Sequence, residues 1–176
     1  EYYVKELYAP AGFVNAEEVQ EFTVSYAGEN EDSVVVRAPA AGLKKVNIKT
    51  LPYPGFPTDM HPQMSVLLCL ADGESAMSET IWSNRFRYVE ELRKMGAKID
   101  IDDQTATFEG NTVFQPAVVK SCDLRAGAAM VIAALMAEGT TEIGGVGYIL
   151  RGYERIDEKL KRIGARIERI QYEDPL

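Results

Sequence analysis

The sequence predicts a mixed α/β domain built from a duplicated unit of helices and strands. The segment Glu91–Ile99 recurs 68 residues later as Lys159–Ile167, with Gly96 matching Gly164. Upstream of each copy lies an apolar stretch that ends near a glycine. Several features that keep one order at a period of this length are typical of a duplicated supersecondary unit rather than of a solenoid repeat.

Composition restricts the class of protein. The chain has 176 residues, of which 46% are hydrophobic and 26% charged, as in one globular domain with a buried core. A net charge of −8 argues against nucleic-acid and membrane-surface partners, because these need a basic face. The two cysteines lie far apart and not at metal-ligand spacing, so we expect a reduced, cytoplasmic protein without a metal site. No run is long enough for a membrane span.

The first 48 residues are predicted to be a partial unit. Glu21–Tyr26 and Ser33–Arg37 alternate between apolar and polar residues and flank a turn-rich segment, which predicts a hairpin. Asn15–Gln20 offers a short helix, and Ala9–Gly12 reads as a loop. We therefore expect a single domain over residues 1–176, with a partial unit at 1–48 and full units at 49–110 and 111–176.

Each full unit is expected to open with a buried helix. Asp59 begins one, to about Asp72, and Asp123 begins the other, to about Glu138. Aspartate is a common N-cap, and a glycine follows each helix as a C-terminal signal. The stretch from Ala126 to Ala137 is hydrophobic on all sides, which is typical of a buried helix.

The remaining elements repeat in the same order. A short strand is followed by an amphipathic surface helix, and an alternating strand or hairpin closes the unit. The predicted strands are 75–81 and 140–146, the helices 84–95 and 151–163, and the closing strands 98–101 with 105–108, and 166–170. Each unit therefore reads as β-α-β-α-β-β.

Three arginines open predicted helices, where helix electrostatics disfavour a cation. Arg85, Arg125 and Arg151 each stand at the start of such a helix. A helix N-terminus carries partial positive charge and normally attracts acidic residues. Backbone N–H groups and a guanidinium directed at one point form a good carboxylate or phosphate site. The sequence therefore predicts that a small anion binds among these helix ends.

A proline-rich segment leads into the first full unit. Leu51–Asp59 has three prolines, which predict a stiff, extended stretch that fixes the direction of Asp59. A linker is one interpretation. The presence of Tyr53 and Phe56 favours a shaped loop of a functional site, because linkers rarely use aromatic residues.

Four motifs carry a family resemblance. The segments Leu51–Gln63, Glu79–Phe86, Asp123–Ala129 and Arg151–Glu154 together resemble the UDP-N-acetylglucosamine 1-carboxyvinyltransferase family, one of the enolpyruvyl transferases. The resemblance runs from about Val46 to Ile170. It implies an inside-out α/β domain in which sheets wrap buried helices. Two such domains face each other across a cleft in the family, and the second is absent from this chain.

The resemblance also implies a reaction. The family moves the enolpyruvyl group of phosphoenolpyruvate onto the 3-hydroxyl of UDP-N-acetylglucosamine and releases phosphate, as the first committed step of peptidoglycan synthesis. Addition gives a tetrahedral ketal, and elimination follows. No metal or organic cofactor is required.

The resemblance implies a role for six residues. Asp59 binds the sugar hydroxyl and is the general base. Arg85, Arg125 and Arg151 surround phosphoenolpyruvate, and Arg151 also takes part in catalysis. Asp123 orients its neighbours, among them Arg125, and Ile81 contacts the nucleotide through its backbone. The full set is Asp59, Ile81, Arg85, Asp123, Arg125 and Arg151.

Several family features are missing or ambiguous. The family's reactive cysteine, further phosphate-binding arginines and a Lys-Asn pair belong to the absent domain. Cys122 lies near a helix start that could make it a nucleophile, although an apolar filler is the favoured interpretation. Cys69 is expected in the core, His61 facing solvent near Asp59, and Trp82 in packing.

Two functions remain open. In the first, the chain is one half of a carboxyvinyltransferase whose site is completed by the second domain. In the second, it is a non-catalytic half or fragment that acts as a ligand-binding or structural module. A complete enzyme in 176 residues would need acid and base on one face with no lid to exclude water, which favours the first.

Overall fold

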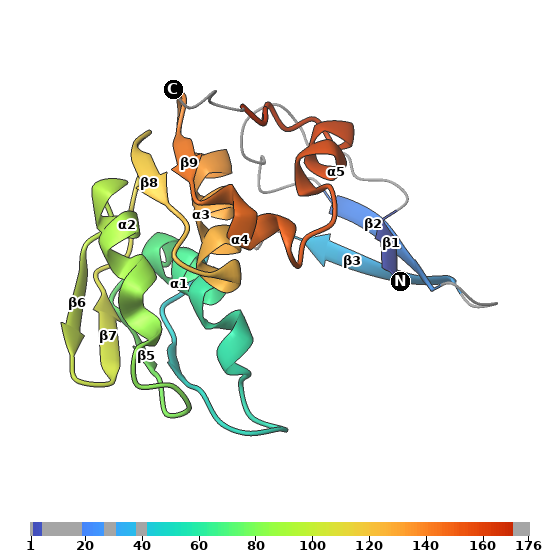
Figure 1. Cartoon of the computed structure of the whole chain (residues 1–176). Coiled ribbons are helices and arrows are strands. Elements are labelled where there is room, and N and C mark those ends of the chain that lie inside the picture. Colours follow the sequence, from blue (N-terminus) through green and yellow to red (C-terminus); the bar gives the residue numbers. More distant parts are fainter. Residues whose placement is uncertain (1, 5–18, 27–30, 38–41, 171–176) are drawn as a thin grey trace. The chain divides into compact units, whose positions relative to one another are not determined.

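The structure is a computed structural model that describes residues 2–4, 19–26, 31–37 and 42–170 (Figure 1). The chain divides into two compact units. One comprises residues 41–153, and the other comprises the described residues of 1–40 and 154–176. The division into units at 1–48, 49–110 and 111–176 stays a prediction.

The smaller unit contains a three-stranded antiparallel sheet and one helix. Strands β1 (Tyr2–Val4), β2 (Val19–Tyr26) and β3 (Glu31–Arg37) pair in the order β1-β2-β3. Helix α5 (Ile156–Arg162) belongs to the same unit. The predicted hairpin is confirmed. Residues 15–18 of the predicted helix 15–20 lie outside the described residues, and residues 19–20 belong to β2. The predicted loop 9–12 also lies outside the described residues.

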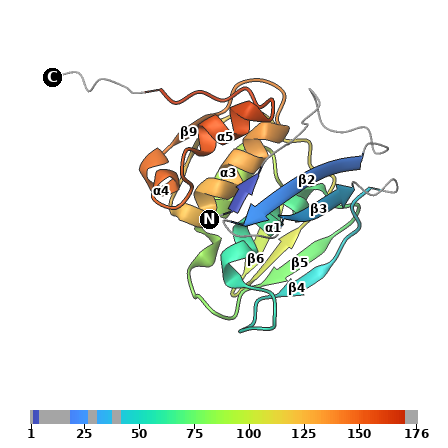
Figure 2. The same cartoon turned by 90° about the vertical axis from the view of Figure 1, so that its right-hand side faces the viewer.

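The first repeat of the larger unit forms a four-stranded sheet, part of which Figure 2 shows. Its order is β4-β5-β7-β6, with β4 parallel to β5 and the other neighbours antiparallel. Helix α1 (His61–Leu70) connects the two parallel strands and packs on β5 and β7. The strands are β4 (Asn47–Lys49), β5 (Ser75–Ser78), β6 (Ile99–Asp102) and β7 (Thr105–Phe108). The predicted hairpin 98–108 is therefore confirmed.

The second repeat has the same beginning. Strand β8 (Val118–Lys120) pairs in parallel with β9 (Glu142–Gly144), and helix α3 (Leu124–Met136) lies between them in sequence. Helices α1 and α3 pack against each other (Figure 1). The duplicated strand-helix-strand order is therefore confirmed by the structure.

The surface helix of the first repeat forms as predicted. It begins with a 3₁₀ turn, η2 (Arg85–Tyr88), and continues as α2 (Val89–Lys94). Val89 and Leu92 face inward and are fully buried. The charged side chains Glu90, Glu91, Arg93 and Lys94 form ion pairs three residues apart along the helix.

The second surface helix is confirmed from Ile156 to Arg162, but its predicted start at Arg151 is wrong. Helix α4 (Val146–Leu150) ends at Arg151, and α5 begins only at Ile156. Gly152 disfavours a helix interior, and Arg155 has φ 47°, in the left-handed region, so the chain turns between the two helices. The strand predicted at 166–170 is also wrong, because no described strand pairs with these residues.

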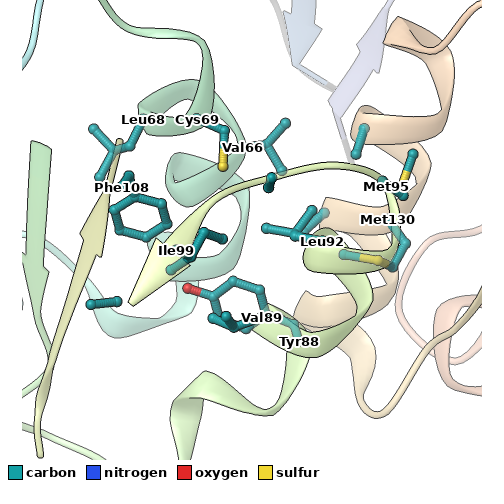
Figure 3. Packing of buried hydrophobic residues seen from close by; sticks show 14 of the residues in the cluster. Val66, Leu68, Cys69, Tyr88, Val89, Leu92, Met95, Ile99, Phe108 and Met130 are labelled. Carbon is teal, nitrogen blue, oxygen red and sulfur yellow. The ribbon is translucent and has the colours of Figure 1, made fainter. Parts of the chain in front are cut away.

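One hydrophobic core joins the two repeats of the larger unit (Figure 3). Side chains from α1, α2, α3 and the four-stranded sheet meet there, and Tyr88 and Phe108 are the largest that are fully buried. Helix α3 is buried over most of its surface, although Ile132 and Leu135 stay about one-third exposed, so burial on all sides was overestimated. No helix of the described residues is long and apolar enough to cross a membrane.

Gly127 explains how closely α3 approaches its neighbours. A Cβ at this position would lie 2.4 Å from Ile149 Cγ1 and 2.6 Å from Ser121 Oγ. Both distances are below any real Cβ contact, so a larger side chain would push α4 away from α3. The small residues of α3 thus permit the packing that the sequence indicated.

Candidate active site

Two arginines bind one exposed carboxylate in the larger unit. Arg85 Nη2 lies 2.9 Å from Asp59 Oδ1, and Arg125 Nη2 lies 2.8 Å from Asp59 Oδ2. The three side chains come from the 3₁₀ turn η1 (Thr58–Met60), from η2 and from α3. Three of the six residues expected in the site therefore meet at one point, from segments 26 and 66 residues apart in sequence.

The proline-rich segment delivers Asp59 to this point. Its ends close on each other, because Leu51 N donates to Phe56 O at 3.0 Å and Gly55 N donates to Pro52 O at 2.8 Å. The Tyr53–Pro54 peptide is cis, and the Tyr53 side chain is 98% exposed. The extended conformation predicted here is wrong, and the segment is a closed turn held by its own backbone.

Asp59 does not cap helix α1, contrary to the sequence prediction. The helix begins at His61 after Met60, and no side chain accepts a cap hydrogen bond there. Pro62 removes one of the N–H groups that a capping aspartate would accept. Asp59 therefore keeps both carboxylate oxygens for the arginines.

Asp123 caps α3, as predicted. Its Oδ1 accepts hydrogen bonds from the backbone N of Arg125 at 2.9 Å and of Ala126 at 2.8 Å. The same hydrogen bonds fix the backbone from which the Arg125 side chain extends toward Asp59. Arg125 is thus confirmed in the first turn of a helix, and Arg85 is confirmed at the start of η2.

The electrostatics of the cluster favour an anionic ligand. The hydrogen bond from Arg125 is the main cause that holds the pKa of Asp59 below its ordinary value, burial opposes it, and Arg85 adds to the lowering. Asp59 in turn raises the pKa of Arg125. The two guanidinium groups share the one exposed carboxylate, and the second carboxylate nearby, Glu79, is buried and, among the described residues, reaches Arg85 only through Thr58. Because the side chains of Asp59 and Arg125 are 57% and 37% exposed, a ligand can reach both.

Arg151 lies elsewhere in the larger unit. It follows the last residue of α4 rather than opening a helix, where the partial negative charge of the helix end suits a cation. Its guanidinium lies 5.1 Å from the centroid of the Tyr148 ring, a cation–π contact. Among the described residues, it makes no hydrogen bond or ion pair with Asp59, Arg85 or Arg125.

Sequence reasoning missed Glu79, a buried residue that is 1% exposed and contacts Thr58, the neighbour of Asp59. Its Oε1 accepts from Thr50 Oγ1 at 2.8 Å and from the backbone N of Ile81 and Trp82 at 2.8 and 3.1 Å. Its Oε2 accepts from Thr58 Oγ1 at 2.8 Å. Burial alone would raise the pKa of Glu79, but these hydrogen bonds outweigh it and hold the pKa below its ordinary value.

A signal for Glu79 was present in the sequence. Side chains alternate across a strand, so Glu79 lies on the same face as Ser75 and Met77, and all three are buried. An acidic residue on the apolar face of a strand indicates a buried polar site. The loop after β5 was also read wrongly at Trp82, which is 62% exposed rather than packed.

His61 is fully buried, although it was expected to face solvent. Its Nδ1 lies 3.2 Å from Glu79 Oε2 without the alignment of a hydrogen bond, and its Nε2 lies 3.2 Å from the Tyr88 hydroxyl. That hydroxyl is 2.6 Å from Ser65 Oγ. Burial lowers the pKa of His61 to about 4, so the ring is neutral at neutral pH. The ring is the first side chain of α1 and packs edge-on against Phe86 and Tyr88.

The two cysteines have the environment of unreactive thiols. Cys69 is buried in α1, as predicted, and burial raises its pKa to about 12. Cys122 is half-buried against the core, and burial followed by the charge of Asp123 raises its pKa. This environment disfavours the thiolate form of Cys122 and agrees with the interpretation as an apolar filler. The described residues contain no group of three potential metal ligands.

Comparison with known proteins identifies the family. A family model described as EPSP synthase (3-phosphoshikimate 1-carboxyvinyltransferase) matches residues 11–160. The chain belongs to the enolpyruvyl transferase family. The enolpyruvyl transferase NikO from Streptomyces tendae has a similar structure, with a TM-score of 0.70 and 27% identity over 79% of this chain and 32% of that chain. The predicted α/β fold of this family is confirmed.

Relatives with higher identity carry one name. The UDP-N-acetylglucosamine 1-carboxyvinyltransferase of Clostridium botulinum is 53% identical over 142 residues, which are 81% of this chain and 34% of that protein. The enolpyruvyl transferase of the same name from Desulfofundulus thermocisternus is 50% identical over 147 residues, which are 84% of this chain and 60% of that protein. The chain thus spans about a third of the first relative's length and 60% of the second's.

Proposed function

We propose that this chain supplies one wall of the active site of a UDP-N-acetylglucosamine 1-carboxyvinyltransferase. The reaction would transfer the enolpyruvyl group of phosphoenolpyruvate to the 3-hydroxyl of the sugar nucleotide. One observation supports this most directly, namely an exposed carboxylate held by two guanidinium groups from separate segments. The carboxylate can act as the base for the sugar hydroxyl, and the adjacent guanidinium groups can bind the anionic phosphoenolpyruvate.

The paired state of Asp59 defines the first step. A carboxylate that two cations stabilise is a weak base. Phosphoenolpyruvate carries a carboxylate and a phosphate, either of which can replace Asp59 as the partner of Arg85 and Arg125. Binding of the anion therefore releases Asp59 and raises its pKa at the moment when the sugar hydroxyl must lose a proton.

The chemistry then proceeds by addition and elimination. Asp59 takes the proton of the 3-hydroxyl while that oxygen bonds to C2 of phosphoenolpyruvate, and the methylene carbon takes a proton from an acid outside this cluster. The arginines stabilise the charge of the tetrahedral ketal. In the second step, C3 returns a proton to the conjugate base of that acid, the C2–O bond to phosphate breaks, and phosphate leaves, which restores the enol double bond.

The other three site residues support this cluster in the proposal. Asp123 holds the Arg125 backbone, and Arg151 binds a further part of phosphoenolpyruvate. The backbone N–H of Ile81 donates a hydrogen bond to Glu79. The backbone carbonyl of Ile81 accepts no hydrogen bond among the described residues, so we assign the contact with the nucleotide to this carbonyl. A second domain completes the site, and neither a metal nor an organic cofactor takes part.

A chimera tests this function. The part of this chain that aligns with the Clostridium botulinum relative replaces the matching 142 residues of that protein, and release of phosphate from phosphoenolpyruvate and UDP-N-acetylglucosamine is measured. We expect turnover that falls by about 10²- to 10⁴-fold in Asp59→Asn, because a general base contributes about that much. Lys98→Gln is the matched control, because the exposed Lys98 side chain forms its ion pair with Glu109, away from the cluster.

The alternative is a non-catalytic half that binds ligands or serves a structural role, which the coverage of 34% of a relative keeps open. A chimera that folds but shows no turnover would favour this non-catalytic alternative. Release of phosphate by the 176-residue chain alone would contradict the proposal that the site is completed by a second domain.

A further inference from the structure

We propose that Glu79 is a positioning residue of this site, which holds the Arg85 guanidinium in place through the Thr58 hydroxyl while Asp59 is exchanged for substrate. The inference rests on the proposed function for the exchange itself. The contacts that carry it are present without any ligand.

Arg85 is held from two sides. Its Nη2 donates to Asp59 Oδ1 at 2.9 Å and to Thr58 O at 3.1 Å, and its Nε donates to Thr58 Oγ1 at 3.2 Å. The Thr58 hydroxyl then donates to Glu79 Oε2 at 2.8 Å. One hydroxyl therefore links the cation of Arg85 to the buried anion of Glu79. The Arg85 side chain is only 11% exposed as a result.

Arg125 lacks such an anchor. Among the described residues, the only hydrogen bond or ion pair of its guanidinium is with Asp59, and the side chain is 37% exposed. When an anion replaces Asp59, Arg125 is free to follow the ligand, whereas Arg85 keeps both bonds to Thr58. The two arginines thus differ, with Arg85 preorganised and Arg125 adaptable. A preorganised donor contributes most to binding and catalysis, since it costs little to order.

The burial of Glu79 argues for positioning rather than for stability. A buried carboxylate is costly, and an apolar residue of similar volume often stabilises a fold as well or better. The four donors of Glu79 join Thr50, the turn that carries Asp59 and the loop that carries Ile81. A single anion therefore sets the relative position of the segments on which the proposed site depends.

The neighbouring histidine does not neutralise this anion. His61 lies against Glu79 Oε2, but it is neutral because it is buried. The other ring nitrogen of His61 lies against the Tyr88 hydroxyl, which in turn lies against Ser65 Oγ, so the histidine rather than the carboxylate has these polar partners. Arg85, through Thr58, is then the cation to which Glu79 is linked among the described residues.

Hydrogen exchange of the Arg85 side chain tests the proposal without ligand. In the ¹⁵N-labelled 176-residue chain, exchange of the Arg85 Nε–H is followed by NMR in the unchanged protein and in Thr58→Val, Thr58→Ser and Glu79→Gln. We expect exchange about tenfold to a hundredfold faster in Thr58→Val and Glu79→Gln, as loss of a charge-assisted hydrogen bond implies. Thr58→Ser keeps the hydroxyl and should restore slow exchange. The Arg125 Nε–H is the internal control.

A purely structural role gives a different result. In that case Glu79→Gln lowers the melting temperature while Arg85 exchange stays unchanged in a folded Thr58→Val protein, and the proposal is overturned. Thr58 is half-buried, so Thr58→Val carries the test even if Glu79→Gln does not fold.

Turnover of the chimera provides a second measurement. Thr58→Val should raise the KM for phosphoenolpyruvate about tenfold with a smaller change in kcat, since it loosens a binding group present in both ground and transition state. Thr58→Ser should restore the KM. An unchanged KM in Thr58→Val contradicts the positioning of Arg85. An inactive chimera with the expected exchange pattern would instead contradict the proposed function alone.

Discussion

Asp59 occupies the cationic pocket that a substrate anion would need, so removal of its charge should strengthen anion binding. We expect Asp59→Asn to bind phosphoenolpyruvate more tightly than the unchanged chain does. The reason is that Arg85 and Arg125 are each paired with one oxygen of Asp59, at 2.9 and 2.8 Å, and a ligand must break both pairs. The same substitution abolishes the base, so binding and turnover should change in opposite directions.

The magnitude follows from the exposure of the two pairs. Ion pairs at a protein surface contribute about 0.2–1 kcal/mol each. The pair with Arg125 is exposed on both sides and belongs at the low end, whereas Arg85 is 11% exposed and its pair belongs at the high end. The sum of about 1.2 kcal/mol corresponds to a dissociation constant about sevenfold lower in Asp59→Asn. The free energy of unfolding should fall by about the same amount, because two cations lose their partner.

Calorimetric titration of the 176-residue chain with phosphoenolpyruvate, and with inorganic phosphate in parallel, measures the effect at neutral pH and low salt. Asp123→Asn is the matched control, since it removes one nearby negative charge that pairs with no guanidinium among the described residues, while asparagine keeps an acceptor for the helix cap. The reasoning is refuted if Asp59→Asn binds either anion equally or more weakly. Equal tightening in Asp123→Asn would mean that general charge, rather than competition for the arginines, controls binding.

Four further predictions concern stability. Arg125→Ala should change the free energy of unfolding in urea by less than about 1 kcal/mol, because the lost surface pair is offset by relief at the helix start. Arg85→Ala should cost about 1.5–3 kcal/mol, since its hydrogen bonds to Thr58 are lost, and equal effects would contradict the asymmetry. Asp123→Ala should lower the free energy of unfolding, measured by thermal unfolding, by about 0.5–2 kcal/mol, and Asp123→Asn should lower it much less. Equal stability of Asp123→Ala and the unchanged chain would contradict a role of the cap in stability. The folded-state pKa of His61 is lowered from 6.5 to about 4, so stability should rise with pH across that window, and His61→Gln should flatten the rise.

Periodicity and spacing predicted most of the larger unit. The apolar stretches before Gly73 and Gly139 became α1 and α3, and the alternating segments became β5 to β7. These features depend on local pattern, which a single sequence contains. The first hairpin was found for the same reason. The aspartate and two of the arginines that now meet were also singled out from their positions, although their meeting depends on the packing of α1 against α3.

Features that depend on tertiary partners were missed. Arg151 was placed at a helix start because residues 151–163 have a helical pattern, but the break at Gly152 and Arg155 depends on the backbone conformation. His61 was read as exposed because it was placed near the loop that precedes the helix, whereas it is the first residue of α1 and is buried. Glu79 has no local signature beyond its strand face, because its role depends on Thr50 and Thr58, more than 20 residues away.

The two repeats differ at the aspartate that precedes each buried helix, which is where function is proposed. Asp59 and Asp123 precede corresponding helices, yet only Asp123 accepts the backbone N–H groups of its helix. Pro62 lacks an N–H, so the first helix offers Asp59 less to cap, and the closed proline-rich turn holds it one 3₁₀ turn before the helix instead. A carboxylate released from capping in one repeat can thus bind an arginine whose backbone is fixed by the capping carboxylate of the other. Duplication therefore provides both halves of the cluster, and a proline in one copy separates their roles.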